Sequence, residues 1–163
     1  MKTLYLVRHA KSSWDHPELS DFDRPLNKRG LKAAPLMGKV LHEKGVIPQQ
    51  VISSSAKRAK ETAITIVKEI GLNPDNIIYA DKIYEASTNT LLTLIKSCDD
   101  KVTSLMLFGH NPTFTDLANV LTDEYIDNIP TAGIVGISFD TDHWKEAKKG
   151  KLLFFDFPKN YKD

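Results

Sequence analysis

Short apolar runs along the chain alternate with longer segments in which apolar residues return every three or four positions. Three runs, at residues 4–7, 51–55 and 104–108, predict buried strands of a parallel or mixed sheet and the points where those strands end. Two later runs, at residues 133–139 and 151–157, are close enough in sequence to pair and to form an antiparallel edge. The pattern therefore predicts an α/β fold with a largely parallel core.

Helical segments fill the intervals between these runs. Asn27 is a candidate N-cap for a helix that extends to about Lys44 and ends at Gly45. A later helix is predicted after Ser87 or Thr88, because either side chain can accept a hydrogen bond from the first turn. Alternation of strand and helix implies right-handed crossovers, so the carboxyl ends of the parallel strands lie along one edge of the sheet.

Two further helices are predicted to begin directly where a strand ends. Ser54 or Ser55 is the candidate N-cap of a helix that Gly71 terminates. Asn111 is the candidate N-cap of a helix whose first residue is Pro112, a position that tolerates proline. Side chains at these junctions are therefore held between a strand end and a helix start.

Basic side chains occupy these strand-to-helix junctions. Arg8 and His9 follow the first strand, and Arg58 lies in the first turn of a helix. His110 follows the strand at residues 104–108. Ligands of open α/β sheets bind beyond the carboxyl ends of the strands, and the arginine fork matches the oxygens of a phosphate. Neighbouring positive charge keeps a histidine neutral, so that it can attack phosphorus, and the four side chains predict a site for a phosphate dianion.

Each of these residues also has a structural interpretation. Arg8 could pair with a carboxylate, and His9 could be a loop residue with satisfied hydrogen bonds. Arg58 could lie on the surface and pair with Glu61, although an arginine in a first helical turn opposes the helix dipole. A phosphate bound at that helix N-terminus would resolve the conflict.

A polar loop at residues 11–25 separates the first strand from the first helix. Its acidic residues have neither the spacing of a calcium loop nor that of zinc ligand pairs, so a solvated loop is expected. Trp14, close in sequence to the basic residues, has two interpretations: a wall of the site or a core side chain.

Composition and charge further narrow the classes of function that fit this chain. The 163 residues include 22 basic and 21 acidic ones, with a formal net charge of +1 and no long block of one sign. The charge gives no support for binding to nucleic acid or to a membrane surface. Cys98 is the only cysteine, which excludes an internal disulfide and a cysteine-based zinc cluster. A single domain over residues 1–163 is predicted, and the cytoplasm is expected because no secretory or membrane-length apolar segment is recognised.

Several motifs, taken together and in order, resemble those of the histidine phosphatase superfamily, which includes phosphoglycerate mutases and acid phosphatases. The motifs are Leu6-Val7-Arg8-His9-Ala10-Lys11-Ser12, Arg24-Pro25-Leu26 with Arg29-Gly30, Ser53 to Thr62, Tyr84-Glu85 and Gly109-His110-Asn111-Pro112. The short chain and the Gly-His-Asn-Pro form are most similar to the SixA-type phosphohistidine phosphatases. The resemblance implies a three-layer α/β/α fold of the phosphoglycerate mutase-like kind, with a mostly parallel mixed sheet and no large cap.

The resemblance also implies a mechanism that uses neither a metal nor a cofactor. His9 attacks the phosphoryl group and is transiently phosphorylated, and water then hydrolyses the phosphoenzyme. Arg8, Arg58 and His110 bind the phosphoryl oxygens and stabilise the developing charge. Glu85 matches a position whose carboxyl group protonates the leaving oxygen in many relatives. Because imidazole leaves more easily than an alkoxide, Glu85 has another role open to it, which is to orient water or an arginine.

Two further positions bear on the resemblance. Ala10-Lys11 stands where many relatives have glycine followed by an acidic or polar residue, so the backbone approach to the ligand is expected to differ there. Arg24 resembles a family position and is expected to brace the first loop.

An uncapped site suits a phosphorylated protein side chain, so the expected partner is a protein that carries phosphohistidine. The same site equally admits a small phosphomonoester. A third alternative, a phosphate-binding module without catalysis, is disfavoured because all four basic residues are present. A nucleotide-binding fold is disfavoured because no glycine-rich fingerprint follows the first strand. The oligomeric state stays open.

Overall fold

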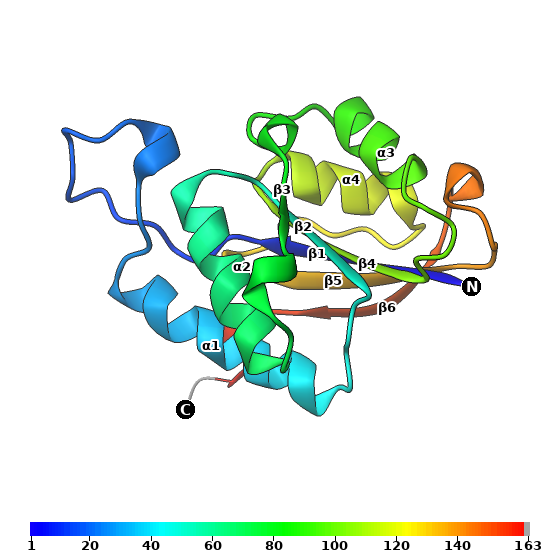
Figure 1. Cartoon of the computed structure of the whole chain (residues 1–163), viewed down its shortest axis with the longest axis horizontal. Helices are drawn as coiled ribbons and strands as arrows, with labels where there is room; N and C mark the ends of the chain where they lie inside the picture. The colour runs from blue at the N-terminus through cyan, green and yellow to red at the C-terminus, as the bar shows by residue number, and fades with distance from the viewer. Residues whose placement is uncertain (162–163) are drawn as a thin grey trace.

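A computed structural model describes residues 1–161 and shows a mixed six-stranded sheet (Figure 1). The strands are β1 (Lys2–Arg8), β2 (Gln50–Ser53), β3 (Ile78–Tyr79), β4 (Ser104–Gly109), β5 (Ile134–Phe139) and β6 (Lys151–Asp156). They lie in the order β3-β2-β4-β1-β5-β6. β1, β4, β2 and β3 are mutually parallel, whereas β5 runs antiparallel to β1 and to β6. The predicted parallel core with an antiparallel edge is confirmed.

Helices cover both faces of this sheet. α1 (Lys28–Glu43) and α2 (Lys57–Glu69) pack on one face, and α3 (Thr88–Lys96) and α4 (Thr113–Leu121) pack on the other (Figure 1). Each face holds its own cluster of buried apolar side chains. The arrangement is the three-layer α/β/α fold that the family resemblance implied.

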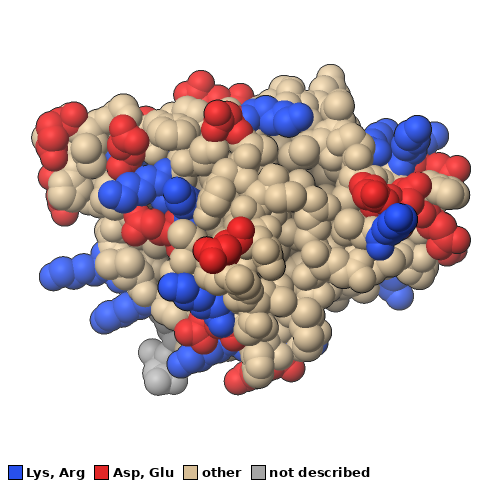
Figure 2. All heavy atoms as spheres, viewed as in Figure 1, with Lys and Arg blue, Asp and Glu red and all other residues tan. Residues whose placement is uncertain are grey.

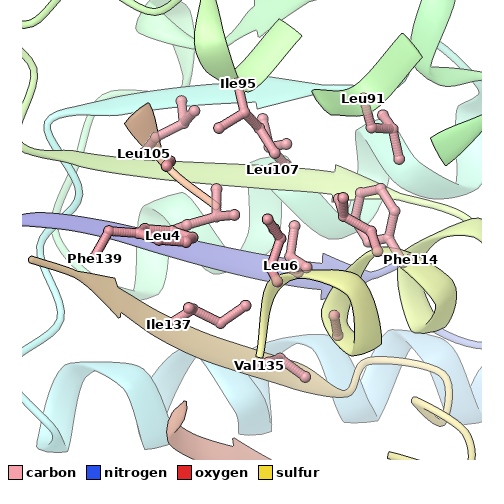
Figure 3. Packing of buried hydrophobic residues seen from close by; sticks show 14 of the residues in the cluster. Leu4, Leu6, Leu91, Ile95, Leu105, Leu107, Phe114, Val135, Ile137 and Phe139 are labelled. Atoms are coloured by element: carbon pink, nitrogen blue, oxygen red, sulfur yellow. The ribbon is translucent and has the colours of Figure 1, made fainter. Parts of the chain in front are cut away.

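Alternation along β1 places its side chains in both clusters. Leu4 and Leu6 are completely buried beneath α3 and α4, whereas Val7 is buried on the face covered by α1 and α2. Figure 3 shows the first of these clusters, in which Leu4 and Leu6 lie among side chains from the neighbouring strands and from α3 and α4. Because β1 is packed on both faces, the polar residues that follow it start from a rigid position.

Two predicted helix caps are confirmed. The side chain of Asn27 accepts a hydrogen bond from the Gly30 N–H (2.9 Å), and α1 begins at Lys28, directly after Asn27. The Ser87 hydroxyl accepts a hydrogen bond from the Thr90 N–H (3.1 Å) at the start of α3.

Two other predicted caps are wrong. α2 has Ala56 as its N-cap, because the Ser54 hydroxyl bonds the N–H of Ala56 itself (3.2 Å) rather than an N–H inside the helix. α4 has Pro112 in the cap position, one residue later than predicted. The Asn111 side chain nevertheless accepts a hydrogen bond from the Thr115 N–H (3.1 Å), so it stabilises the same helix end from one position earlier.

No helix within residues 1–161 combines the length and the apolar character needed to cross a membrane.

Candidate active site

Three neighbouring parallel strands bring the site together. In the sheet, β4 lies between β1 and β2, and Arg8 of β1 is level with Gly109 of β4. The His9 N–H donates to the Gly109 carbonyl (3.0 Å), and the Ser54 N–H donates to the Phe108 carbonyl (2.9 Å). The ends of all three strands are therefore fixed to one another by backbone hydrogen bonds, as the predicted common edge requires.

His9 is held in one tautomer by the backbone carbonyl of the next residue, Ala10. The side chain is only 8% exposed, and its Nδ1 lies 2.7 Å from the Ala10 carbonyl oxygen. A carbonyl oxygen can only accept, so Nδ1 carries the proton and Nε2 presents a lone pair. Burial lowers the pKa of His9 from 6.5 to about 3, with smaller contributions from the charges on His110, Arg58 and Arg8. His9 is therefore a neutral imidazole with a free nitrogen.

His110 lies beside His9, with 5.2 Å between the ring centroids. Its Nε2 is 2.7 Å from the Ser54 hydroxyl, whereas its buried Nδ1 has no hydrogen-bond partner among the described residues. Burial, together with a smaller effect of the neighbouring Arg58 charge, lowers the pKa of His110 from 6.5 to about 4. The ring therefore offers one unsatisfied nitrogen next to the nucleophile candidate.

Arg8 and Arg58 supply positive charge from two directions. One Arg8 Nη donates to the Ile129 carbonyl (2.9 Å), which fixes the guanidinium at the end of β1. Arg58 is 6% exposed and comes from the first turn of α2. The buried Nε of each arginine has no hydrogen-bond partner within residues 1–161. Both groups thus retain a donor for an anion.

Arg58 pairs with Asp21, and the alternative pairing with Glu61 is wrong. Arg58 donates one hydrogen bond to the Asp21 carbonyl (2.6 Å) and one to its carboxylate (3.0 Å). Glu61 instead accepts a hydrogen bond from the Leu26 N–H (3.3 Å). Arg58 is buried because α2 starts beneath the polar loop, which brings Asp21 over the helix end.

Asp21 is the site residue that sequence reasoning missed. Its carboxylate also accepts hydrogen bonds from the Tyr84 hydroxyl (2.6 Å) and from the Arg24 Nε (3.1 Å). The Tyr84 hydrogen bond and the Arg58 charge lower the Asp21 pKa to about 2, and the same hydrogen bond raises the pKa of Tyr84 to about 12. Asp21 lies in a loop whose apolar residues have no regular spacing, so the sequence could not indicate which residues its carboxylate contacts.

Thr62 connects the segment after β1 to the start of α2, and the sequence offered no reason to assign it a role of its own. Its hydroxyl donates to the Arg58 carbonyl (2.7 Å) and accepts a hydrogen bond from the Ala10 N–H (2.9 Å). The residue after His9 is therefore tied to the first turn of α2.

Glu85 lies at a cavity of about 350 Å³ that Arg58, Tyr84 and His110 also line. Glu85 is exposed and has a φ of 56°, a left-handed conformation that non-glycine residues seldom adopt. The structure thus brings the carboxyl group that the sequence singled out to the same cavity as Arg58 and His110, whereas Arg8 and His9 are not among the residues that line it.

Trp14 corrects one expectation. It is 77% exposed, fills no core and is absent from the lining of that cavity. Its ring stacks on the Arg24 guanidinium, with the arginine carbon 3.6 Å from the ring centroid. Arg24 also donates hydrogen bonds to the Ser12 hydroxyl (2.7 Å) and the Ser13 carbonyl (3.1 Å), so it braces the first loop as expected.

No cluster of metal-binding side chains is found in the part of the chain that the structure describes. The site instead brings together two arginines and two neutral histidines, and the carboxyl groups of Asp21 and Glu85 line the cavity beside Arg58 and His110. This arrangement suits the binding and transfer of a phosphoryl group.

Comparisons with known proteins bear on this chemistry. Residues 4–91 match the model of the histidine phosphatase superfamily (branch 1). An uncharacterised protein of Mycobacterium tuberculosis is 32% identical over 165 residues, which cover 94% of this chain and 100% of that protein.

Solved structures agree with the family match. A protein assigned as the phosphohistidine phosphatase SixA of Agrobacterium tumefaciens is 29% identical and has a TM-score of 0.83, covering 96% of this chain and 98% of that one. The protein histidine phosphatase SixA, solved with tungstate, shares the fold with a TM-score of 0.86 at 20% identity, covering 98% of this chain and 99% of that one. Family and fold support phosphatase activity through a histidine. The chain belongs to branch 1 of the histidine phosphatase superfamily.

Proposed function

We propose that this histidine phosphatase removes phosphate from phosphohistidine in proteins, through a phosphorylated intermediate on His9. The observation that carries the proposal is the His9 tautomer. Its Nδ1 is engaged by the Ala10 carbonyl (2.7 Å), so a lone pair on Nε2 is available beside two arginines. We also propose that residues 1–163 act as one domain.

The first step transfers the phosphoryl group. The lone pair on Nε2 of His9 forms the new bond to phosphorus, and the bond from phosphorus to the substrate nitrogen breaks. The substrate imidazole leaves with that electron pair and takes a proton from solvent. The Ala10 carbonyl stabilises the positive charge that the His9 ring acquires, since it accepts from Nδ1.

The second step returns the enzyme to its starting state. Water attacks phosphorus, the bond to His9 breaks, and inorganic phosphate leaves while Nε2 regains its lone pair. Arg8, Arg58 and His110 stabilise the charge on the phosphoryl oxygens in both steps. Support comes from their buried nitrogen atoms that have no hydrogen-bond partner among the residues described, namely Nε of each arginine and Nδ1 of His110. The arginines carry the charge that a metal ion supplies in other phosphatases.

The active-site cavity also admits a small phosphomonoester, because Glu85 lines it and can protonate an alkoxide leaving group. Phosphate release from a phosphohistidine-bearing protein and from p-nitrophenyl phosphate, both with a chelator present, separates the two functions. We expect faster turnover of the protein substrate. Similar or faster turnover of sugar phosphates would identify a broad phosphomonoesterase instead.

Replacing Glu85 with glutamine should affect the two substrate classes differently. The leaving alkoxide of a sugar phosphate needs a proton, so kcat on sugar phosphates should fall by about 100-fold. Imidazole is a better leaving group, so phosphohistidine turnover should change much less. Steady-state kinetics on both classes provide the measurement, and an equal loss on both would contradict the leaving-group argument.

The histidines of the site should titrate at unusually low pH. Burial lowers the pKa values of His9 to about 3 and of His110 to about 4, whereas the Asp100 carboxylate raises that of His143 above 6.5. His9 thus stays neutral, and able to attack, until the pH falls towards 3. NMR titration of the imidazole C–H signals in the free protein should show His143 protonating at a higher pH than His9 and His110. A His9 midpoint at or above 6.5 would refute this electrostatic picture.

A further inference from the structure

A second and larger cavity lies beside the first turns of α1. Its volume is about 690 Å³, compared with about 350 Å³ for the active-site cavity. Basic side chains and apolar residues line it together. We name it the basic groove and define it by the cations Lys11, Arg29, Lys32 and Lys159 and by the apolar residues Leu36, Pro130, Phe157 and Pro158.

The charge of the basic groove is uncompensated within the part of the chain that is described. None of its four cations forms an ion pair with a carboxylate there, and no acidic residue lines the groove. The first turn of α1 also lacks acidic residues, so the positive end of the helix dipole adds to the same field. Figure 2 shows lysine and arginine side chains protruding beside the start of α1, at the lower left. An anionic partner would stabilise this arrangement.

The basic groove is joined to the catalytic strand end through the backbone. Lys11 follows His9 by two residues, and Thr131 precedes Ala132. The Ala132 N–H lies 3.0 Å from the His9 carbonyl oxygen, to which it donates. The groove and His9 are therefore parts of one connected backbone framework, so a single bound protein can reach both.

We propose that the basic groove binds an acidic segment with apolar side chains, located in the phosphorylated protein that this enzyme acts on. The inference rests on the proposed function. Exposed lysines and arginines provide the charge complementarity, and the apolar lining provides contact area. Leu36, Phe157 and Pro158 are half-buried, so they form a floor for a peptide and do not protrude as residues that insert into a bilayer do.

Peptide binding tests the groove without catalysis. A fluorescent peptide of glutamate and leucine is titrated into the wild type, the variant Lys32→Glu with Lys159→Glu, and the control Lys39→Glu with Lys148→Glu. Lys39 and Lys148 are exposed and do not line the groove, so both variants change the net charge equally. We expect the groove variant alone to weaken binding, by about tenfold at low salt and less at high salt. Equal effects in both variants, absent binding by the wild type, or stronger binding to phosphatidylserine vesicles would each overturn the proposal.

Turnover separates this inference from the proposed function. The groove variant should raise KM for the phosphohistidine protein and leave kcat/KM for p-nitrophenyl phosphate unchanged, because the small substrate does not reach the groove. A wild type that hydrolyses p-nitrophenyl phosphate but not the phosphoprotein would reject the protein substrate, whereas the peptide titration decides the groove independently. An unchanged KM for a phosphoprotein that is turned over would reject the groove.

Discussion

Replacing His9 with alanine is expected to abolish phosphatase turnover, with a loss of at least ~10³-fold in kcat, because the covalent intermediate proposed on His9 can no longer form. Arg8 and Arg58 stay in place, so inorganic phosphate should still bind. Phosphate release and incorporation of labelled phosphate into the protein measure the first effect, and calorimetry with inorganic phosphate measures the second.

The matched control for this prediction is His42→Ala. His42 is an exposed histidine in the last turn of α1 and does not line the active-site cavity, so its removal should leave turnover unchanged. Activity of His9→Ala near that of the wild type would reject His9 as the nucleophile. Loss of both turnover and phosphate binding would indicate instead that the cavity itself has collapsed.

Replacing Arg58 with alanine should weaken both substrate binding and the chemical step. Loss of one donor to the transition-state charge typically costs ~2.7–4 kcal/mol, which corresponds to a decrease of about 100- to 1000-fold in kcat. The substitution also removes one of the three hydrogen-bond partners of the Asp21 carboxylate, and the other two, Tyr84 and Arg24, stay in place. Steady-state kinetics on the phosphoprotein and on p-nitrophenyl phosphate provide the measurement.

Two companion variants define what the Arg58 result means. Arg58→Lys keeps the positive charge but loses the planar guanidinium that can donate two parallel hydrogen bonds. It should therefore recover part of the substrate binding and little of the kcat that Arg58→Ala loses. Lys57→Ala, the preceding exposed residue of α2, should behave as the wild type. Similar kinetics for Arg58→Ala and Lys57→Ala would remove Arg58 from the mechanism.

The positions of the main strands, and of the basic residues that follow them, could be predicted from the sequence. The apolar run before Arg8 and His9 is buried on both faces of the sheet, so its hydrophobicity alone indicated a central strand. The junction before His110 was equally clear, because a glycine separates a strong strand from a helix start. In these places local pattern and tertiary structure agree.

The interactions of the loop at residues 11–25 could not be predicted in the same way. Asp21 contacts Arg58 and Tyr84, which follow it by 37 and 63 residues. Such contacts depend on how the loop folds over α2, and no periodic pattern records that path. Trp14 illustrates the same limit, since its large apolar ring lies exposed on Arg24 and neither interpretation of the sequence anticipated this.

The position of β1 in the sheet has a consequence for the order in which the protein can fold during synthesis. β1 is synthesised before the other five described strands, yet its two neighbours, β4 and β5, are made only at residues 104–109 and 134–139. This apolar central strand therefore lacks its native partners until about 100 further residues have been translated, which slows folding and favours contact with chaperones. Catalytic competence appears late, because the strand end that carries His9 takes its shape only when β4 and β5 have paired with it.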